Sequence, residues 1–475
     1  MKISGGRRAA VLARLTCAAA LCVCAAACRR EPSVSVLMIS IDSLRSDHLG
    51  GNGYGRATTP VLDRVARDGT SWTGALAAAP WTTPSMMSVM TGLYPDVHHV
   101  EEDDRTIDAG VMLLAEQFRA AGYSTAGFVP SATLTARFGF SRGFEFWDER
   151  DFGHRTVTSP AQASSVIHWL EKTKGPFFAW VHFWDPHYNY NPPSPYDSMF
   201  LDARMRAAVK PGAEPDVIEL KNHRTALAPD LIGWLLAEYD GEIAYTDRYI
   251  GEILEALKTQ GRLEGTLIVI FGDHGEAFQE HGWLTHTNTV YEETIRVPLI
   301  ARLPGRIAAG KRIEGPCSLV QLAGSLRAWA GLTGGGKEPV ALPSDSAAPP
   351  GEGPPPPGAP FYLSTTRRQA TVLSARSGRW SLVSDFDACR FELYDLAVDP
   401  GQMHDLAAER PEILAAMRAG LRSWIMERRR ERVVPLRRIE EVDPELFQKL
   451  GALGYADLFG DKMGKRSDAD LLKCL

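Results

Sequence analysis

Two apolar runs rich in β-branched residues each end in an aspartate. Residues 34–42 finish at Asp42, and residues 267–273 finish at Asp273. A continuous apolar run of this length is typical of a strand that is buried on both faces of a parallel sheet. Open α/β sheets bind their ligands at the carboxyl edge of the strands. We therefore expect both aspartates at that edge, where a strand-end carboxylate is either a metal ligand or a cap for the next helix.

Helical and strand patterns alternate along most of the chain. Amphipathic and apolar stretches predict a helix from 59, a helix at 111–121, a strand at 123–129, a helix and a strand within 161–181, a helix at 239–257 and a strand at 297–303. This rhythm favours a mostly parallel sheet covered by helices on both faces. The acids of the 239–257 helix and Arg248 are expected on a solvated face.

The C-terminal third has a different pattern. Residues 343–360 are rich in Pro and Gly and predict an exposed linker, whereas 194–228 is an excursion with weak periodicity. Residues 375–383 and 391–396 predict two antiparallel strands around a turn, and helices are expected from 411 to 430. The arginine-rich run at 428–432 is expected to be a solvated helix end, with contact to anionic lipid headgroups as the alternative.

The N-terminal segment has the pattern of an export signal. A basic start is followed by a short apolar run and by three alanines before Cys28, which predicts a lipoprotein-type signal peptide at 1–27 and a lipid-anchored protein that faces the periplasm or cell exterior. Plain secretion after Ala27 is the alternative. The net charge of −6 argues against a nucleic-acid partner, which would need clustered basic residues. Cys317, Cys389 and Cys474 have no Cys-x-x-Cys spacing, so neither a zinc site nor a dense disulfide framework is predicted.

A short polar loop precedes an apolar helix at residues 86–92. It places Thr82 and Thr83 at the helix N-terminus, where unpaired backbone N–H groups and the helix dipole favour an anion. A hydroxyl there can attack a bound oxyanion or coordinate a metal, although ordinary N-capping would also explain these residues.

Histidines gather after two of the predicted strands. His274 follows Asp273 directly, with His281 and His286 shortly after it, and Asp185 and His187 follow the strand at 177–183. Two strand-end acids, an imidazole and a hydroxyl loop are what a divalent metal site needs to activate a nucleophile for ester cleavage. Asp185 and His187 would suit a substrate anion, unless their aromatic-rich loop simply packs on itself.

These motifs, in this order, resemble those of the sulfatase family in the alkaline phosphatase superfamily. The motifs are residues 42–50, the Thr82 loop, residues 185–187, residues 272–276, and residues 392–396 with Asp399 and Pro400. The resemblance implies an alkaline-phosphatase-like α/β sandwich, with a large mostly parallel sheet flanked by helices and a smaller C-terminal antiparallel sheet with a helix. Its units would be a catalytic domain at 34–335, a linker or loop at 336–360, a subdomain at 361–430 and a tail at 431–475.

The resemblance also implies the roles of the site residues. One divalent metal would be held by Asp42, Thr82, Asp273 and His274, with calcium, magnesium or manganese favoured by the oxygen ligands and zinc also suited by the imidazole. Thr82, His187 and His286 would be catalytic, and Asp185, His187 and His281 would bind the substrate, a small-molecule, glycan or lipid ester.

One departure from the family pattern bears on the mechanism. Sulfatases carry Cys or Ser at the position of Thr82 and oxidise it to formylglycine, with an Arg where this chain has Met86, and an acid where it has Ser43. Threonine cannot give that aldehyde, but it is the nucleophile in phosphodiesterases and headgroup phosphotransferases of the superfamily. We therefore expect a hydrolase of sulfate or phosphate esters that uses unmodified Thr82. The alternatives are a phosphoryl or headgroup transferase, or an inactive relative that binds sulfated or phosphorylated glycans.

Overall fold

The computed structural model describes most of the chain. The described residues are 34–102, 104–150, 157–210, 212–223, 225–332, 341–346, 351–366, 370–431, 434–439 and 468–475. The predicted signal peptide, Cys28, the domain boundary at 335 and most of the predicted tail lie outside these residues. In the described part, no helix combines the length and the apolar character needed to cross a bilayer.

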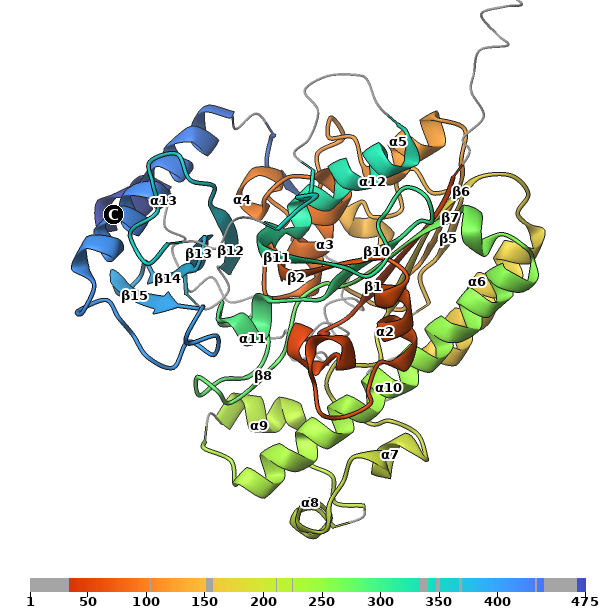
Figure 1. Cartoon of the computed structure of the whole chain (residues 1–475), viewed down its shortest axis with the longest axis horizontal. Helices are drawn as coiled ribbons and strands as arrows, with labels where there is room; N and C mark the ends of the chain where they lie inside the picture. The colour runs from red at the N-terminus through yellow and green to blue at the C-terminus, as the bar shows by residue number, and fades with distance from the viewer. Residues whose placement is uncertain are drawn as a thin grey trace, which may run out of the picture.

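The centre of the fold is an eight-stranded sheet (Figure 1). Its spatial order is β11 (Lys311–Ser318), β2 (Thr70–Leu76), β10 (Leu299–Arg302), β7 (Thr266–Gly272), β1 (Ser35–Ile41), β6 (Phe177–Phe183), β4 (Ser124–Phe128) and β5 (Phe146–Asp148). Every neighbouring pair is parallel except those that involve β10, which runs antiparallel to both β7 and β2. The predicted fold class is therefore confirmed, and the predicted strand at 297–303 is the one reversed strand.

Two apolar layers cover the sheet, one on each face. Val36 and Met38 of β1 face the layer made with α3 (Thr82–Thr91), α5 (Leu114–Ala120) and α12 (Leu322–Ala330). Leu37 and Ile39 face the layer made with α2 (Pro60–Arg67), α6 (Ser159–Lys172) and α10 (Pro229–Thr259). Because side chains alternate along a strand, a run with apolar residues at consecutive positions, such as 36–39, can supply both layers.

The long helix α10 carries acidic residues that were predicted to be exposed to solvent. Asp240, Glu242 and Asp247 are buried, so the predicted solvated face is wrong for them, although Arg248 is exposed. Asp247 accepts hydrogen bonds from the backbone N–H groups of Val61 (2.8 Å) and Leu62 (2.9 Å) at the start of α2. Buried acids are tolerated on this helix because they satisfy polar groups of the elements beneath it.

A second, antiparallel sheet lies beside the first. It has the order β12 (Tyr362–Thr366), β13 (Val372–Ser377), β14 (Trp380–Asp385) and β15 (Arg390–Asp395), and α13 (Pro411–Glu431) packs on it. The stretch at 375–383 was predicted as one strand and is in fact parts of β13 and β14 around a turn at Gly378. The backbone N–H of Thr365 donates to the carbonyl of Ala78, which joins this sheet to the segment before α3.

Shorter elements complete the described part of the chain. They are η1 (Ser46–His48), η2 (Gly50–Asn52), α4 (Pro95–His98), β3 (Arg105–Thr106), η3 (Ala136–Phe138), α7 (Tyr196–Met199), α8 (Ala203–Ala208), α9 (Val217–His223), η4 (Leu263–Gly265), β8 (Ala277–Phe278), β9 (Leu284–Thr285), α11 (Glu292–Ile295), η5 (Leu319–Gln321), β16 (Arg437–Arg438) and α15 (Asp468–Cys474). A disulfide joins Cys389, in the β14–β15 turn, to Cys474 in α15.

Candidate active site

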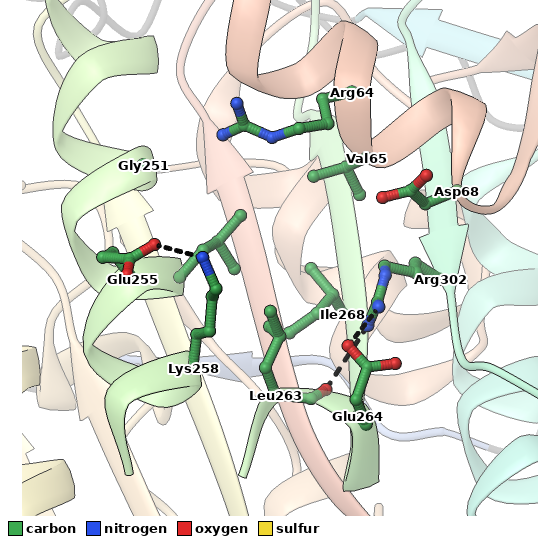
Figure 2. Close-up of a pocket in the computed structure, with 11 residues that line it drawn as sticks. Arg64, Val65, Asp68, Gly251, Glu255, Lys258, Leu263, Glu264, Ile268 and Arg302 are labelled. Atoms are coloured by element: carbon green, nitrogen blue, oxygen red, sulfur yellow. Dashed lines mark hydrogen bonds and ion pairs between the residues drawn. The ribbon is translucent and has the colours of Figure 1, made fainter. Parts of the chain in front are cut away.

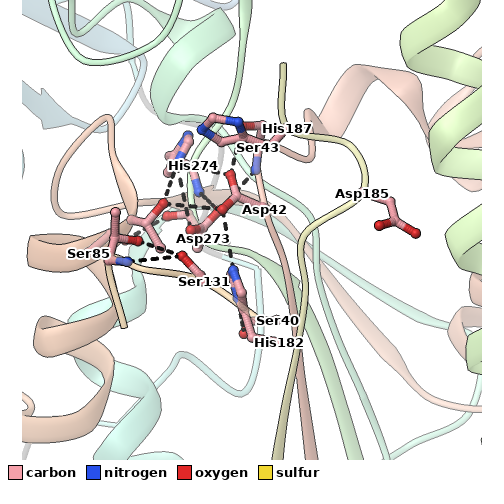
Figure 3. Close-up of polar contacts among 12 residues, drawn as sticks. Ser40, Asp42, Ser43, Ser85, Ser131, His182, Asp185, His187, Asp273 and His274 are labelled. Carbon is pink, nitrogen blue, oxygen red and sulfur yellow. Dashed lines mark hydrogen bonds and ion pairs between the residues drawn. The ribbon is translucent and has the colours of Figure 1, made fainter. Parts of the chain in front are cut away.

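Asp42 and Asp273 meet at the carboxyl edge of the large sheet (Figure 3). Thr82 lies beside them, with its hydroxyl 3.3 Å from Asp42. In the β1–β7 register Ile41 lies opposite Gly272, so the next residue of each strand is an aspartate. Gly272 has no room for a side chain, because a Cβ there would lie 2.4 Å from the carbonyl oxygen of Leu44. Thr82 enters from the first position of α3, whose N-terminus meets this edge.

The side chains of Asp42, Asp273 and His274 fit a cation. Their nearest ligand atoms all lie within 4.8 Å of one another, and all three residues are fully buried. Nδ1 of His274 lies 2.9 Å from the carbonyl oxygen of Gly275 and must therefore carry the proton. In the neutral ring Nε2 then presents a lone pair, 3.5 Å from an oxygen of Asp42 and 3.6 Å from Oδ2 of Asp273.

A bound cation would also stabilise the two buried carboxylates of this cluster electrostatically. Burial raises the pKa of Asp273 well above its usual range, and the charge of Asp42 raises it further. Burial also acts to raise the pKa of Asp42, but surrounding histidines outweigh it and hold that pKa low. Burial lowers the pKa of His274, which favours the neutral, ligating ring. Oδ2 of Asp273 is buried and accepts no hydrogen bond, so it is the oxygen that a metal would satisfy.

The hydroxyl of Thr82 lies inside this cluster. Its Oγ1 is 3.3 Å from Oδ2 of Asp42 and 3.2 Å from Nε2 of His274, and the residue is fully buried. The neighbouring threonine behaves differently: Oγ1 of Thr83 donates to the carbonyl of Thr133, at 2.9 Å. Only Thr82 of the two therefore faces the candidate metal ligands.

His187 and His286, which the sequence predicts as catalytic residues, lie beside the cluster. The ring of His286 is centred 4.3 Å from that of His274 and 5.0 Å from that of His187. Nδ1 of His286 is 3.0 Å from Oε1 of Glu276, which fixes the orientation of the ring. The loop with Trp184 and Tyr188 stacks on His187, so that loop both packs on itself and delivers a histidine to the site.

Two predicted site residues are placed elsewhere. Asp185 points away from the cluster (Figure 3), and its carboxylate accepts from the backbone N–H groups of Thr158 (2.5 Å) and Ser159 (2.9 Å) at the start of α6. His281 has both ring nitrogens engaged, with Glu293 at 2.8 Å and the carbonyl of Gln402 at 2.9 Å. Both residues therefore have local structural partners in place of a substrate.

Sequence reasoning missed three polar residues at the site. Ser43, with a φ of 55°, donates its backbone N–H to Asp273 (3.1 Å) and its hydroxyl to Asp42 (2.8 Å). Glu276 orients His286, and His182 of β6 contacts Asp42. His182 could have been found from the sequence. If the predicted strands β1 and β6 are parallel and end at one edge, the polar residue near the end of β6 lies beside the end of β1.

A cavity lies at the opposite edge of the sheet (Figure 2). It has a volume of about 370 Å³ and is lined by residues of α2, α10 and the amino-terminal end of β7. Two of its bases are paired within it, Lys258 with Glu255 at 3.3 Å and Arg302 with Glu264 at 2.6 Å. Since α/β sheets bind at their carboxyl edge, we place the active site at the Asp42 cluster and not in this cavity.

An α/β sandwich with a hydroxyl, two carboxylates and imidazoles at that edge defines an ester hydrolase of the alkaline-phosphatase-like class. Comparison with known proteins identifies the family. Residues 35–332 match the family model described as Sulfatase, and the chain belongs to the sulfatase family.

The relatives are distant. The arylsulfatase of Clostridium perfringens is 24% identical over 338 residues, which cover 58% of this chain and 70% of that enzyme. The ulvan-active sulfatase of Formosa agariphila is 25% identical, and the match covers 57% of this chain and 56% of that protein. The crystal structure of the phosphonate monoester hydrolase of Agrobacterium radiobacter has the same fold, with a TM-score of 0.66, 23% identity, and coverage of 84% of this chain and 96% of that one.

Proposed function

We propose that this protein is a metal-dependent hydrolase of sulfate or phosphate esters in which unmodified Thr82 is the nucleophile. The observation that carries the proposal is the position of Oγ1 of Thr82, 3.3 Å from Asp42 and 3.2 Å from His274, at the N-terminus of α3. A threonine that only capped the helix would have no reason to face buried candidate metal ligands.

The metal would be held by Asp42, Asp273 and His274, together with the hydroxyl of Thr82. When bound, a divalent cation lowers the pKa of a coordinated hydroxyl and offsets the negative charge of the reacting group. Three oxygen ligands favour calcium, magnesium or manganese, and the single imidazole also suits zinc.

The protein residues would divide the remaining work. The backbone N–H groups at the start of α3 bind the oxyanion and hold its phosphorus or sulfur atom in front of Thr82. The Thr82 hydroxyl gives its proton to Oδ2 of Asp42, 3.3 Å away, as its oxygen attacks that atom. The bond to the leaving oxygen breaks, and His286 gives a proton to the leaving alcohol. His187 contacts the anion. Water then hydrolyses the threonyl ester, which regenerates the hydroxyl and releases the inorganic anion.

The proposal includes both ester classes because the relatives do. One is named an arylsulfatase and another, by structure, a phosphonate monoester hydrolase. This chain has Thr82 and Met86 where formylglycine formation needs a Cys or Ser and an Arg. Formylglycine therefore cannot form, which argues for chemistry that needs only a hydroxyl. The same hydroxyl chemistry serves phosphorus esters, and we rank these first.

We also propose that the protein works outside the cytoplasm, anchored to a membrane through lipidated Cys28. The disulfide between Cys389 and Cys474 supports export, because disulfides persist in oxidising compartments. Its substrate would then be a small-molecule, glycan or lipid ester that reaches the exterior of the cytoplasmic membrane.

The test is a matrix of metals and esters. Residues 29–475 are purified without metal and incubated with calcium, magnesium, manganese or zinc, and with an aryl phosphate monoester, diester, phosphonate or sulfate. We expect turnover of at least one ester with at least one metal, and its loss in Thr82→Ala. Mass spectrometry of the peptide that contains Thr82 should show an unmodified threonine. Full activity of Thr82→Ala would refute the assignment, and metal binding without turnover of any ester would favour a glycan-binding protein or a transferase.

A further inference from the structure

Behind Asp42, three buried side chains form a line of hydrogen bonds that the proposed reaction does not use. Nε1 of Trp180 lies 2.9 Å from Oγ of Ser40, and that Oγ lies 2.9 Å from Nδ1 of His182. Nε2 of His182 then lies 3.3 Å from Oδ2 of Asp42. All four residues have no measurable exposure to solvent. Ser40 and His182 are register partners in β1 and β6 (Figure 3), so the sheet itself aligns them.

The chemistry of these groups determines which one donates and which one accepts in each hydrogen bond. An indole N–H can only donate, so Ser40 accepts from Trp180. Among the described residues, Nδ1 of His182 is the acceptor within reach of the Ser40 hydroxyl proton, so in the neutral ring Nδ1 accepts it. A neutral imidazole that accepts at Nδ1 carries its proton at Nε2, and Nε2 faces a carboxylate oxygen that can only accept. Each group is satisfied in this one arrangement.

We propose that His182 is a positioning residue that orients the Asp42 carboxylate for the metal, and that the Ser40 hydroxyl, which accepts from Trp180, bonds to Nδ1 and leaves the ring proton on Nε2. The inference rests on the proposed function, since it concerns the same metal site. Oδ1 of Asp42 accepts from the hydroxyl of Ser43 at 2.8 Å, and Oδ2 accepts from His182. Donors on both oxygens hold the carboxylate plane in one orientation toward Asp273 and His274.

A packing role alone does not explain a histidine at this place. The neighbouring β6 residues Trp180 and Phe183 are also fully buried, and an apolar residue would fill the same volume without the cost of removing an imidazole from water. The polar side chain is compensated only if its hydrogen bonds are made. Residues that hydrogen-bond a metal ligand change metal affinity by about 10- to 100-fold when they are replaced.

The first test measures metal affinity directly. Metal-free protein is titrated with each of the four metals by calorimetry, for the unsubstituted chain, His182→Leu and His182→Gln. Leucine removes the donor, whereas the amide nitrogen of glutamine occupies nearly the position of Nε2. We expect His182→Leu to bind metal about 10- to 100-fold more weakly, and His182→Gln to recover most of that loss. His281→Leu, which alters a histidine outside the cluster, should leave the affinity unchanged.

The outcomes separate this inference from the proposed function. If the unsubstituted chain binds none of the metals, the proposed function fails. If it binds metal and His182→Leu binds equally well, only the positioning role of His182 fails. Equal weakening in His182→Leu and His182→Gln would also overturn the inference, because packing and not the donor would then be responsible.

The second test does not depend on a variant that might misfold, because it uses the unsubstituted metal-free protein. Histidine labelled with ¹⁵N distinguishes the Nε2–H tautomer, the Nδ1–H tautomer and the imidazolium by their nitrogen chemical shifts. We expect His182 in the Nε2–H form, assigned by the signal that disappears in His182→Gln. Ser40→Ala should shift the resonance of the unprotonated Nδ1, because Nδ1 no longer accepts the hydroxyl proton, while Nε2 keeps its proton for Asp42. An Nδ1–H or doubly protonated ring in the unsubstituted protein would overturn the inference.

Discussion

Oγ1 of Thr82 lies 3.2 Å from Nε2 of His274, although 192 positions separate the two residues in the chain. The proton on Nδ1 of His274 is held by the carbonyl of Gly275, so the ring offers Thr82 an acceptor or, together with Asp42 and Asp273, a metal ligand. The contact joins the first turn of α3 to the end of β7. It therefore links a hydroxyl, an anion-binding helix end and a cation-binding strand edge in one place.

Replacement of Thr82 should abolish turnover while the fold persists. We expect Thr82→Ala to lower kcat by at least about a thousandfold, as loss of a covalent nucleophile does in other enzymes, and Thr82→Ser to keep measurable activity. Thr83→Ala is the matched control. Its hydroxyl bonds to Thr133 and not to the cluster, so it should cost about 1 kcal/mol of stability and little activity. Equal loss of activity in both alanine variants would contradict the assignment.

Metal removal should lower the thermal stability of the protein. Two carboxylates, one of them with a buried oxygen that accepts no hydrogen bond, repel each other without a cation between them. At a free metal concentration of 100 times Kd, binding adds about 2.7 kcal/mol to the free energy of unfolding. Differential scanning fluorimetry with chelator and with added metal measures this shift. Asp273→Asn should abolish the shift, and a metal-dependent shift of normal size in that variant would place the metal elsewhere.

The sequence predicted the parts of this site that lie at the ends of long apolar strands. β1 and β7 are recognisable because most of their positions are apolar, and this is so because both sheet faces are covered. β2 and β11 were not predicted. Their residues 70–76 and 311–318 are rich in Thr, Gly, Lys and Arg, and β11 runs at the sheet edge with a register shift before Pro316. Such strands owe their conformation to pairing with a neighbour more than to their own pattern.

The sequence also could not predict which partner a carboxylate near a strand end would bind. Asp185 also follows a strand, two residues past the end of β6, yet it holds the start of α6. Periodicity places a residue on an edge or a face, but it does not say which of two nearby backbone or metal partners the carboxylate will reach. That choice depends on the packing of α6 against β6, which is a tertiary property.

Asp247 should give stability a measurable dependence on pH. Burial raises the pKa of its carboxyl to about 7, although the N–H groups of Val61 and Leu62 oppose the shift. A carboxyl with a raised pKa in the folded state binds a proton there that the unfolded chain has already lost. Its contribution is therefore fully present below about pH 4 and is lost as the pH rises towards 7.

Urea unfolding of the wild type and of Asp247→Asn between pH 4.5 and 8.5 measures this contribution. The free energy of unfolding of the wild type, relative to the variant, should fall up to about pH 7 and then level off. The difference isolates Asp247 from other buried acids, such as Glu242, which remain in both proteins. Two parallel curves across the whole range would show that Asp247 is ionised in the folded protein.

The disulfide between Cys389 and Cys474 should stabilise the C-terminal sheet. It anchors α15 to the β14–β15 turn across 85 positions of sequence, so its reduction frees a long loop in the unfolded chain. In the chain-entropy model a loop of that size corresponds to about 4.5 kcal/mol, and the melting temperature should fall in reductant and in Cys389→Ala. Cys317 is a buried free thiol in the core of the large sheet and provides an internal control. In the protein of residues 29–475 with its disulfide intact, alkylation should label no cysteine in the native state. After unfolding without reductant it should label only Cys317. Three labels after unfolding without reductant would show that the disulfide is absent.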